Sequence, residues 1–309
     1  MKKPFILAAS MNPTLQKTLV LPGFFKDTVN RTREYRLDTA GKGLNVSRVL
    51  TQLGKECRLL TPLGGFFRPL YLEFCAQDRL RVEWVESSSQ IRLCYTIIDK
   101  SDKSVTELIE EAERVEEGTE KRLLDAFSPL VPECGTLIIS GTKAPGFSDE
   151  LIPEMVRQAR AAGSRIILDI CGKDLINSLP HKPDIIKPNL YEFISTFAPE
   201  IISNNKIQGD EKEIKKRVGI IWAELREKYN CTLVLTRGAN SVWYTEKEDM
   251  FEFSFNAVEP VNTIGSGDAF TAGFAAALEQ GASIREAVAE GVRCGALNAG
   301  ILRPGVIKQ

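Results

Sequence analysis

Histidine is nearly absent from this chain of 309 residues, since it occurs once, as His181. A zinc site built on a histidine pair is therefore excluded, and a serine–histidine–aspartate triad would have to use His181. An excess of charge of one sign is also lacking, because 40 Lys+Arg stand against 41 Asp+Glu. A balanced chain has no basic field for a phosphodiester backbone, so we expect no nucleic-acid partner.

Paired cysteines and long apolar runs are missing as well. The seven cysteines form no C-x-x-C pair, and this odd, scattered set predicts reduced thiols in a cytoplasmic protein. No apolar run approaches the roughly 20 residues of a membrane span, so we expect no membrane partner. The apolar run Phe5–Ala9 is too short for a signal peptide and is soon followed by Asn12-Pro13. It predicts a buried first strand.

Short apolar runs alternate with amphipathic segments over most of the chain. The segments Leu44–Leu53 and Asp149–Ala162 are each followed by glycine, which favours the end of a helix. Two-sided apolar strands separated by helices predict an α/β fold, a parallel sheet with helices on both faces. The expected strands are Phe5–Ala9, Cys57–Leu60, Thr136–Ser140, Arg165–Asp169, Asp184–Lys187 and Thr232–Thr236.

Two regions, from about 14 to 38 and from about 82 to 109, contain strand-like runs without an intervening helix. The runs are Arg33–Leu37, Ile91–Ile98 and Ser104–Leu108. They predict a small sheet laid over one edge of the core. A lid and a set of extra strands on the main sheet are both open interpretations.

Two polar segments carry weaker signals. Glu107–Glu120 contains seven glutamates, which favour a solvated helix face over a metal-binding carboxylate cluster. Ser203–Lys216 predicts a surface loop that enters a helix ending near Tyr229.

The glycine-rich motifs are the candidates for phosphate chemistry, although neither GxxxxGK[ST] nor GxGxxG is present. The run Asn262-Thr263-Ile264-Gly265-Ser266-Gly267-Asp268 leads into an alanine-rich segment that predicts a helix. Glycines at such a turn expose amides at the positive end of the helix, which favours an anion. A carboxylate at Asp268 would repel a bound anion, so it does not serve anion binding alone. It has a role there if it takes a proton from a hydroxyl group that attacks the anion. Taken alone, the motif favours an ordinary carboxylate of a first helical turn.

Two further motifs lie where helices are expected to begin. Ala40-Gly41-Lys42-Gly43-Leu44-Asn45 is either a substrate turn or a plain turn and cap. Asn189 and Glu192 follow a strand and would share one helix face, where they could orient water around a divalent cation. A capping motif is the alternative interpretation of that pair.

The order and spacing of these motifs, together with Asn12-Pro13-Thr14 and Ser140–Gly146, resemble the ribokinase-like (PfkB) carbohydrate kinases over essentially the whole chain. The resemblance is greatest to the branch that contains fructose-1-phosphate kinase and tagatose-6-phosphate kinase. It implies a ribokinase-like three-layer α/β/α core with a small β-sheet lid. The chain, residues 1–309, would be a single kinase domain.

On the ATP side, the resemblance implies that Asp268 is the base and that the amides of the turn form an anion hole. Asn189 and Glu192 would organise Mg²⁺ through water. The implied anion-hole residues are Gly265, Ser266 and Gly267, and the implied ATP-binding residues are Lys187, Asn189, Thr236, Gly238 and Asn298, with Asn298 beside the adenine.

On the sugar side, the resemblance implies that Gly41, Lys42 and Asn45 form the substrate turn and that Arg92 grips a phosphate already on the substrate. Three departures from the family pattern also fall there. Gln16 stands where an aspartate usually binds sugar hydroxyls, Ala40 replaces a glycine, and Glu110-Glu111-Ala112-Glu113 replaces Glu-Pro-Gly-Pro. The departures make kinase activity a firmer inference than substrate identity.

We therefore expect an ATP- and Mg²⁺-dependent kinase acting on a hydroxymethyl group of a phosphorylated ketohexose, of the fructose 1-phosphate or tagatose 6-phosphate type. A kinase of an unphosphorylated sugar or nucleoside is the alternative within the same class. A sensing homologue without catalysis is the alternative from another class. In this family the small sheet often joins two copies, so a homodimer through the lid sheet is expected.

Overall fold

The structure, a computed structural model, describes residues 5–308. The extreme ends of the predicted 1–309 domain, residues 1–4 and 309, lie outside the described residues.

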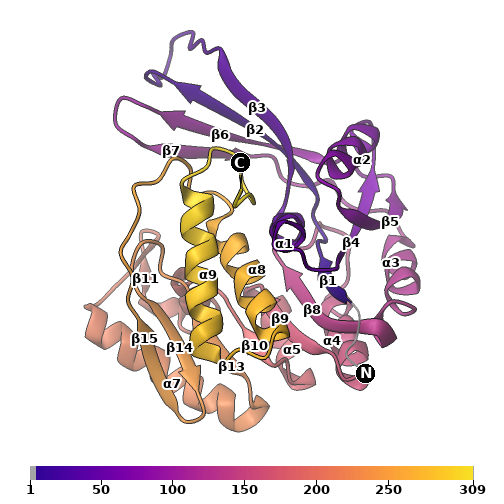
Figure 1. The fold of residues 1–309 in the computed structure, drawn as a ribbon, viewed down its shortest axis with the longest axis vertical. Coiled ribbons are helices and arrows are strands. Elements are labelled where there is room, and N and C mark those ends of the chain that lie inside the picture. Colours follow the sequence, from indigo (N-terminus) through magenta and orange to yellow (C-terminus); the bar gives the residue numbers. More distant parts are fainter. Residues whose placement is uncertain (1–4, 309) are drawn as a thin grey trace.

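A nine-stranded sheet forms the middle layer of the molecule (Figure 1). All neighbouring strands from β5 (Arg81–Ser87) to β13 (Thr232–Leu235) are parallel, and β14 (Val242–Glu246) and β15 (Asp249–Phe253) complete one edge in antiparallel fashion. The six strands expected from the apolar runs all occur in it, so the prediction of a parallel sheet is confirmed. In spatial order the strands are β15 (Asp249–Phe253), β14 (Val242–Glu246), β13 (Thr232–Leu235), β10 (Ile185–Ile186), β9 (Arg165–Asp169), β8 (Cys134–Ser140), β1 (Phe5–Ala9), β4 (Cys57–Gly64) and β5 (Arg81–Ser87).

Helices cover both faces of this sheet. Neighbouring residues of a strand point to opposite faces, and on β8 both faces are packed against helices. On β8, Ile138 packs with Phe274 in one apolar cluster, whereas Leu137 packs with Met155 in the other. The predicted three-layer α/β/α core is therefore confirmed. One face carries α1 (Lys42–Gln52), α2 (Arg68–Gln77), α8 (Ser266–Glu279) and α9 (Ile284–Ala299), and the other carries α3 (Thr119–Phe127), α4 (Leu151–Ala161), α5 (Gly172–Ser178), α6 (Leu190–Phe197) and α7 (Glu211–Tyr229).

A separate four-stranded sheet, called the lid sheet below, projects from one end of the core (Figure 1). Its strands, in spatial order, are β3 (Glu34–Ala40), β2 (Thr14–Leu21), β6 (Arg92–Asp99) and β7 (Val105–Ile109). The interpretation as extra strands on the main sheet is therefore wrong. One boundary is also corrected, because β5 (Arg81–Ser87) pairs with β4 at the edge of the main sheet.

The predicted helix face at Glu107–Glu120 is wrong. Glu107 lies in β7, an extended segment follows, and α3 begins only at Thr119. The carboxylates of Glu110, Glu113 and Glu116 instead accept hydrogen bonds from three backbone amides of residues 88–93. Side-chain acceptors of this kind satisfy backbone amides that have no backbone acceptor. Within residues 5–308 no cluster of three metal-ligating side chains occurs, here or elsewhere.

Three other expectations concern the surface and the thiols. Ser203–Lys216 includes most of a hairpin formed by β11 (Ile202–Ser203) and β12 (Lys206–Ile207), and the helix that follows ends at Tyr229 as predicted. All seven cysteines are free.

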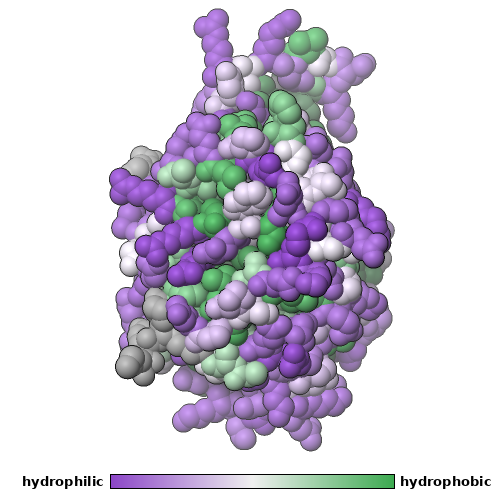
Figure 2. Space-filling model, turned by 90° about the vertical axis from the view of Figure 1, so that its right-hand side faces the viewer, coloured by the Kyte–Doolittle hydropathy of each residue, from purple (hydrophilic) through white to green (hydrophobic). Residues whose placement is uncertain are grey.

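Figure 2, turned toward the side on which α2 and β5 lie, shows hydrophilic residues over most of that face. Across residues 5–308, every helix is too short or too polar to cross a membrane.

Candidate active site

A cavity of about 370 Å³ lies between the carboxyl ends of the parallel strands and the lid sheet. The beginnings of α1 and α8 open onto it, as ligand sites in open α/β sheets are expected to do. The lid sheet contributes Thr14, Gln16 and Arg92 to its wall. Motifs that are far apart in the sequence, from residue 14 to residue 268, therefore meet around one cavity.

The turn before α8 has the conformation that its glycines predict. Gly265 has φ = 82°, and a Cβ atom there would lie 2.7 Å from the Gly305 nitrogen, so only glycine fits. The Ser266 amide donates a hydrogen bond to the Thr263 carbonyl at 3.2 Å. Among the described residues, the amides of Gly265 and Gly267 have no hydrogen-bond acceptor. The amides of the two glycines are thus available for an anion, whereas the Ser266 amide is engaged within the turn.

Asp268 lies in the first turn of α8, is 6% exposed and lines the cavity. Burial raises the pKa of Asp268 to about 6, although Lys42, the hydrogen bond from Asn45 and Lys187 all act in the opposite direction. Asn45 Nδ2 donates to Asp268 Oδ2 at 2.8 Å. A carboxylate with this pKa is ionised at neutral pH and basic enough to accept a proton from a reacting hydroxyl.

Asn189 and Glu192 form the capping box at the start of α6. Glu192 Oε2 accepts from the Asn189 amide, while Lys42 Nζ lies 2.8 Å from Glu192 Oε1. Burial lowers the pKa of Lys42, but the combined attraction of Asp169, Glu192 and Asp268 outweighs burial and leaves it above its ordinary value. The capping interpretation is therefore confirmed, and the same side chains also line the cavity.

Asp169, which the motif analysis missed, is the most connected carboxylate of the cavity. It ends β9 and lies 3.2 Å from Lys187 Nζ, and its Oδ2 also accepts from the hydroxyls of Ser140 and Thr271. Burial alone would raise the pKa of Asp169, but Lys187, Lys42 and the hydrogen bond from Thr271 hold it below the usual range. One signal for it was present: an aspartate closing a buried parallel strand lies at the ligand-binding edge of the sheet.

The sugar-side residues of the lid sheet are held by their neighbours. Arg92 Nε donates to Thr14 Oγ1 at 3.0 Å, and Arg92 Nη1 donates to the Glu110 carbonyl at 3.2 Å. Gln16 Nε2 donates to Thr96 Oγ1. Cys94, Glu107 and Ile109 are other cavity residues that sequence reasoning missed, and Thr263 and Ile264 of the glycine-rich run also line the cavity.

The structure brings most, but not all, of the implied residues together. Gly41, Lys42, Asn45 and Thr236 line the cavity, whereas Gly238, Ser266 and Asn298 do not. Asn298 is fully buried, and it donates to the Ile264 carbonyl and to Ser266 Oγ while accepting from the Val306 amide. Asn298 thus braces the turn before α8 against the C-terminal segment, and its place beside the adenine stays a prediction.

Comparisons with known proteins agree with this geometry. The model of the pfkB family carbohydrate kinases matches residues 11–305. Tagatose-6-phosphate kinase of Staphylococcus epidermidis is 26% identical over 302 residues, covering 95% of this chain and 92% of the relative.

Two solved structures show the same fold. A protein described as a possible 1-phosphofructokinase from Thermotoga maritima superposes with a TM-score of 0.83 at 20% identity, over 96% of this chain and 92% of the other. Ribokinase from the same organism superposes with a TM-score of 0.73 at 18% identity, over 97% and 95%. The predicted ribokinase-like fold is thus confirmed. Because the family model covers nearly all of the sequence, the chain belongs to the pfkB family of carbohydrate kinases, which are phosphotransferases with an alcohol group as acceptor.

Proposed function

We propose that this carbohydrate kinase transfers the γ-phosphate of ATP to a hydroxymethyl group of a phosphorylated ketohexose, with Asp268 as the base. The observation that carries the proposal is the placement of Asp268. It is a buried carboxylate with a pKa of about 6, and it lines the same cavity as Gly265 and Gly267, whose amides are free. Phosphoryl transfer requires mainly positioning and charge stabilisation from the protein.

In the proposed reaction, the acceptor oxygen attacks the γ-phosphorus as its proton passes to Asp268. A bond forms between the acceptor oxygen and phosphorus, and the bond from phosphorus to the β,γ-bridging oxygen breaks, releasing ADP. The amides of Gly265 and Gly267, at the positive end of α8, stabilise the charge on the transferred group. The lid sheet excludes water from the cavity and so limits hydrolysis of ATP.

Magnesium fits this donor set as an ion held mainly by water and phosphate. The cavity offers the carboxylates of Asp169 and Glu192 and the amide oxygen of Asn189, but no three-carboxylate cage exists among residues 5–308. Mg²⁺ commonly binds through one or two carboxylates plus substrate phosphates. When bound, it would neutralise phosphate charge, while Lys42 and Lys187 supply the cations that this chain itself contributes.

The substrate class rests on Arg92 and on the tagatose-6-phosphate kinase relative. Two of the guanidinium donors are used by Thr14 and Glu110, which fixes the plane of the group and leaves other N–H donors for a phosphate. Gln16 replaces a carboxylate with an amide that both donates and accepts, so the hydroxyl pattern recognised differs from that of an aspartate site.

A coupled assay of ADP release tests the substrate. It would cover fructose 1-phosphate, fructose 6-phosphate, tagatose 6-phosphate, free hexoses and nucleosides. Arg92→Ala is expected to raise KM strongly for phosphorylated acceptors only, whereas Arg157→Ala, at an exposed position on α4, serves as the control. An equal effect of Arg92→Ala on unphosphorylated acceptors would favour the alternative kinase, and no turnover of any acceptor would favour a sensing role.

Asp268→Asn tests the base. It should reduce kcat by roughly a factor of a thousand or more while ATP binding stays near normal, because a neutral amide cannot take the proton. Near-normal turnover of this variant would refute the assignment.

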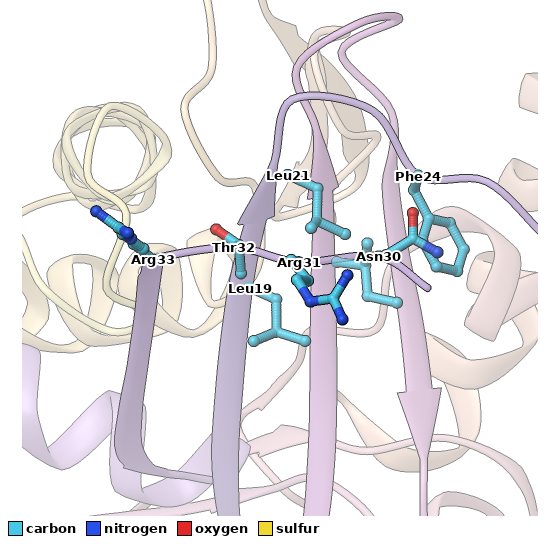
Figure 3. Close-up of a pocket in the computed structure, with 8 residues that line it drawn as sticks. Leu19, Leu21, Phe24, Asn30, Arg31, Thr32 and Arg33 are labelled. Atoms are coloured by element: carbon cyan, nitrogen blue, oxygen red, sulfur yellow. The ribbon is translucent and has the colours of Figure 1, made fainter. Parts of the chain in front are cut away.

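We also propose that the protein is a cytoplasmic homodimer joined through the outer face of the lid sheet. Alternation along β2 places Leu19 and Leu21 on the face opposite Gln16. They line a hollow of about 720 Å³, over which Arg31 lies (Figure 3). Tyr35, opposite Leu19 in the sheet, is 59% exposed and adds apolar surface to this face.

Sedimentation velocity tests the dimer. Tyr35→Asp should convert dimers to monomers, because it buries a charge at the proposed interface. Phe66→Asp is the control, since Phe66 is 83% exposed but precedes α2 and is not part of the lid strands. A wild-type protein that sediments as a monomer at assay concentration would refute the proposal.

A further inference from the structure

Arg48 is fully buried on α1 and does not line the cavity. It nevertheless contacts Asn45, whose side chain donates a hydrogen bond to Asp268. Its Nη1 donates to Asn45 Oδ1 and to the Pro304 carbonyl, each at 3.1 Å. Its Nη2 donates to the carbonyl and the hydroxyl of Thr39, and its Nε donates to Asp78 Oδ2, each at 2.8 Å. One guanidinium thus joins α1 to the lid strand β3, to the end of α2 and to the C-terminal segment.

The contact with Asn45 decides which way the amide faces. A guanidinium has only donors, so the end of the amide that meets Arg48 must be the oxygen. The NH₂ end of Asn45 must then face Asp268, to whose Oδ2 it donates at 2.8 Å. The opposite orientation would place the amide oxygen against the carboxylate and the NH₂ group against the guanidinium, and both contacts would be repulsive.

The C-terminal segment holds the same amide from the other side. A Cβ atom on Gly305, where φ is +65°, would lie 2.7 Å from both Cβ and Oδ1 of Asn45. Asn45 therefore has little room to change rotamer. Within residues 5–308, Asn45 is the only side chain that donates to Asp268, which leaves Oδ1 of the carboxylate for an acceptor hydroxyl.

We propose that Arg48 is a positioning residue of the kinase reaction: it holds the Asn45 amide with its nitrogen toward Asp268 and so orients the base. The inference rests on the proposed role of Asp268. A buried, fully bonded guanidinium is costly compared with an apolar side chain of similar size, which is consistent with retention for geometry rather than for stability alone.

Arg48→Lys is the main test variant. Lysine keeps the positive charge beside Asp78 but cannot donate to Asp78, Thr39, Pro304 and Asn45 at the same time. The Asn45 side-chain amide therefore loses the hydrogen bond that fixes its orientation. We expect kcat to fall about tenfold or more with KM for ATP within about threefold, and the acidic limb of the kcat–pH profile to move upward because the carboxylate loses its donor. Arg58→Lys, the same change at an ion-paired arginine on β4 that does not line the cavity, should leave kcat and the profile unchanged.

A double-mutant cycle separates positioning from general destabilisation. If Arg48 acts through Asn45, the Arg48→Lys/Asn45→Ala pair should have the kcat of Asn45→Ala alone, since the second change removes nothing further. Additive losses in kcat, or a wild-type kcat for Arg48→Lys, would overturn the proposal. If Arg48→Lys does not fold, a wild-type kcat and pH profile for Asn45→Ala overturn it, and a loss of kcat with a raised acidic limb supports it.

Asp268→Asn measured in parallel distinguishes the two proposals. Turnover by Asp268→Asn would refute the base itself. An inactive Asp268→Asn beside additive losses would refute only the positioning role of Arg48.

Discussion

Lys187 Nζ lies 3.2 Å from Asp169 Oδ2, and both side chains are almost completely buried, with exposed fractions of 2% and 3%. Lys187 Nζ also lies 5.7 Å from the centroid of the Phe270 ring. The resemblance assigned Lys187 to ATP, but in this structure its charge is balanced by a carboxylate of the next strand. Lys187 and Asp169 thus form a buried ion pair in the wall of the cavity.

Asp169→Asn should lower the free energy of unfolding by about 3 kcal/mol, because it leaves Lys187 charged and without its carboxylate partner in a buried place. Urea unfolding at neutral pH measures this. Asp125→Asn, which breaks the exposed Lys121–Asp125 pair, is the control and should cost less than about 1 kcal/mol. Equal losses in the two variants would contradict the assigned burial of the pair.

Asp268→Asn should stabilise the protein while it abolishes turnover. The pKa of Asp268 is about 6 when folded, above its ordinary value, so the folded state binds the proton more tightly. The carboxylate thus costs stability above about pH 6, and this cost disappears as pH falls toward the unfolded pKa near 4. We expect a gain of roughly 2 kcal/mol at about pH 8 that shrinks at about pH 5. A variant less stable than wild type at both pH values would contradict the prediction.

Turnover should fall below about pH 6 with unit slope, because the base must be ionised to accept the proton. The measurement is kcat at saturating ATP and acceptor across the acidic range. Substrate phosphates also titrate in this range, so a control without substrate is needed. The control is the difference in stability between Asp268→Asn and wild type, measured as a function of pH. A profile that stays flat to about pH 4 would contradict a base with this pKa.

Gly265→Ala should destabilise the turn before α8 by more than the strain of a positive φ alone, because the added Cβ atom also meets the backbone. A Cβ atom at Gly265 meets the Gly305 nitrogen at 2.7 Å, whereas one at Gly163, where φ is +72°, meets nothing within 4 Å. Gly163→Ala should therefore cost about 1 kcal/mol and leave kcat unchanged. Gly265→Ala should cost more and lower kcat about tenfold or more, since it moves an amide of the anion site. Unfolding curves and kcat for both variants decide this.

The lid sheet shows where sequence reasoning reached its limit. Strand-like patterns predicted its strands, because alternation is a local property. The same patterns could not assign residues 82–87, since β5 joins the main sheet through pairing with β4. The glutamates after β7 looked like a solvated helix face, and their contacts with the backbone amides of residues 88–93 became visible only in the folded chain.

The sequence by itself determined what depends on local dihedral preference and short spacing. Examples are the parallel α/β fold, the glycine turn before α8 and the Asn189–Glu192 capping box. Only the tertiary structure decided the partners of the reactive side chains. Asn45 meets Asp268 across 223 positions, Lys42 meets Glu192 across 150, and Asn298 meets Ile264 across 34. Such contacts depend on which strand ends lie side by side after folding, and the short-range preferences of the chain carry no record of that arrangement.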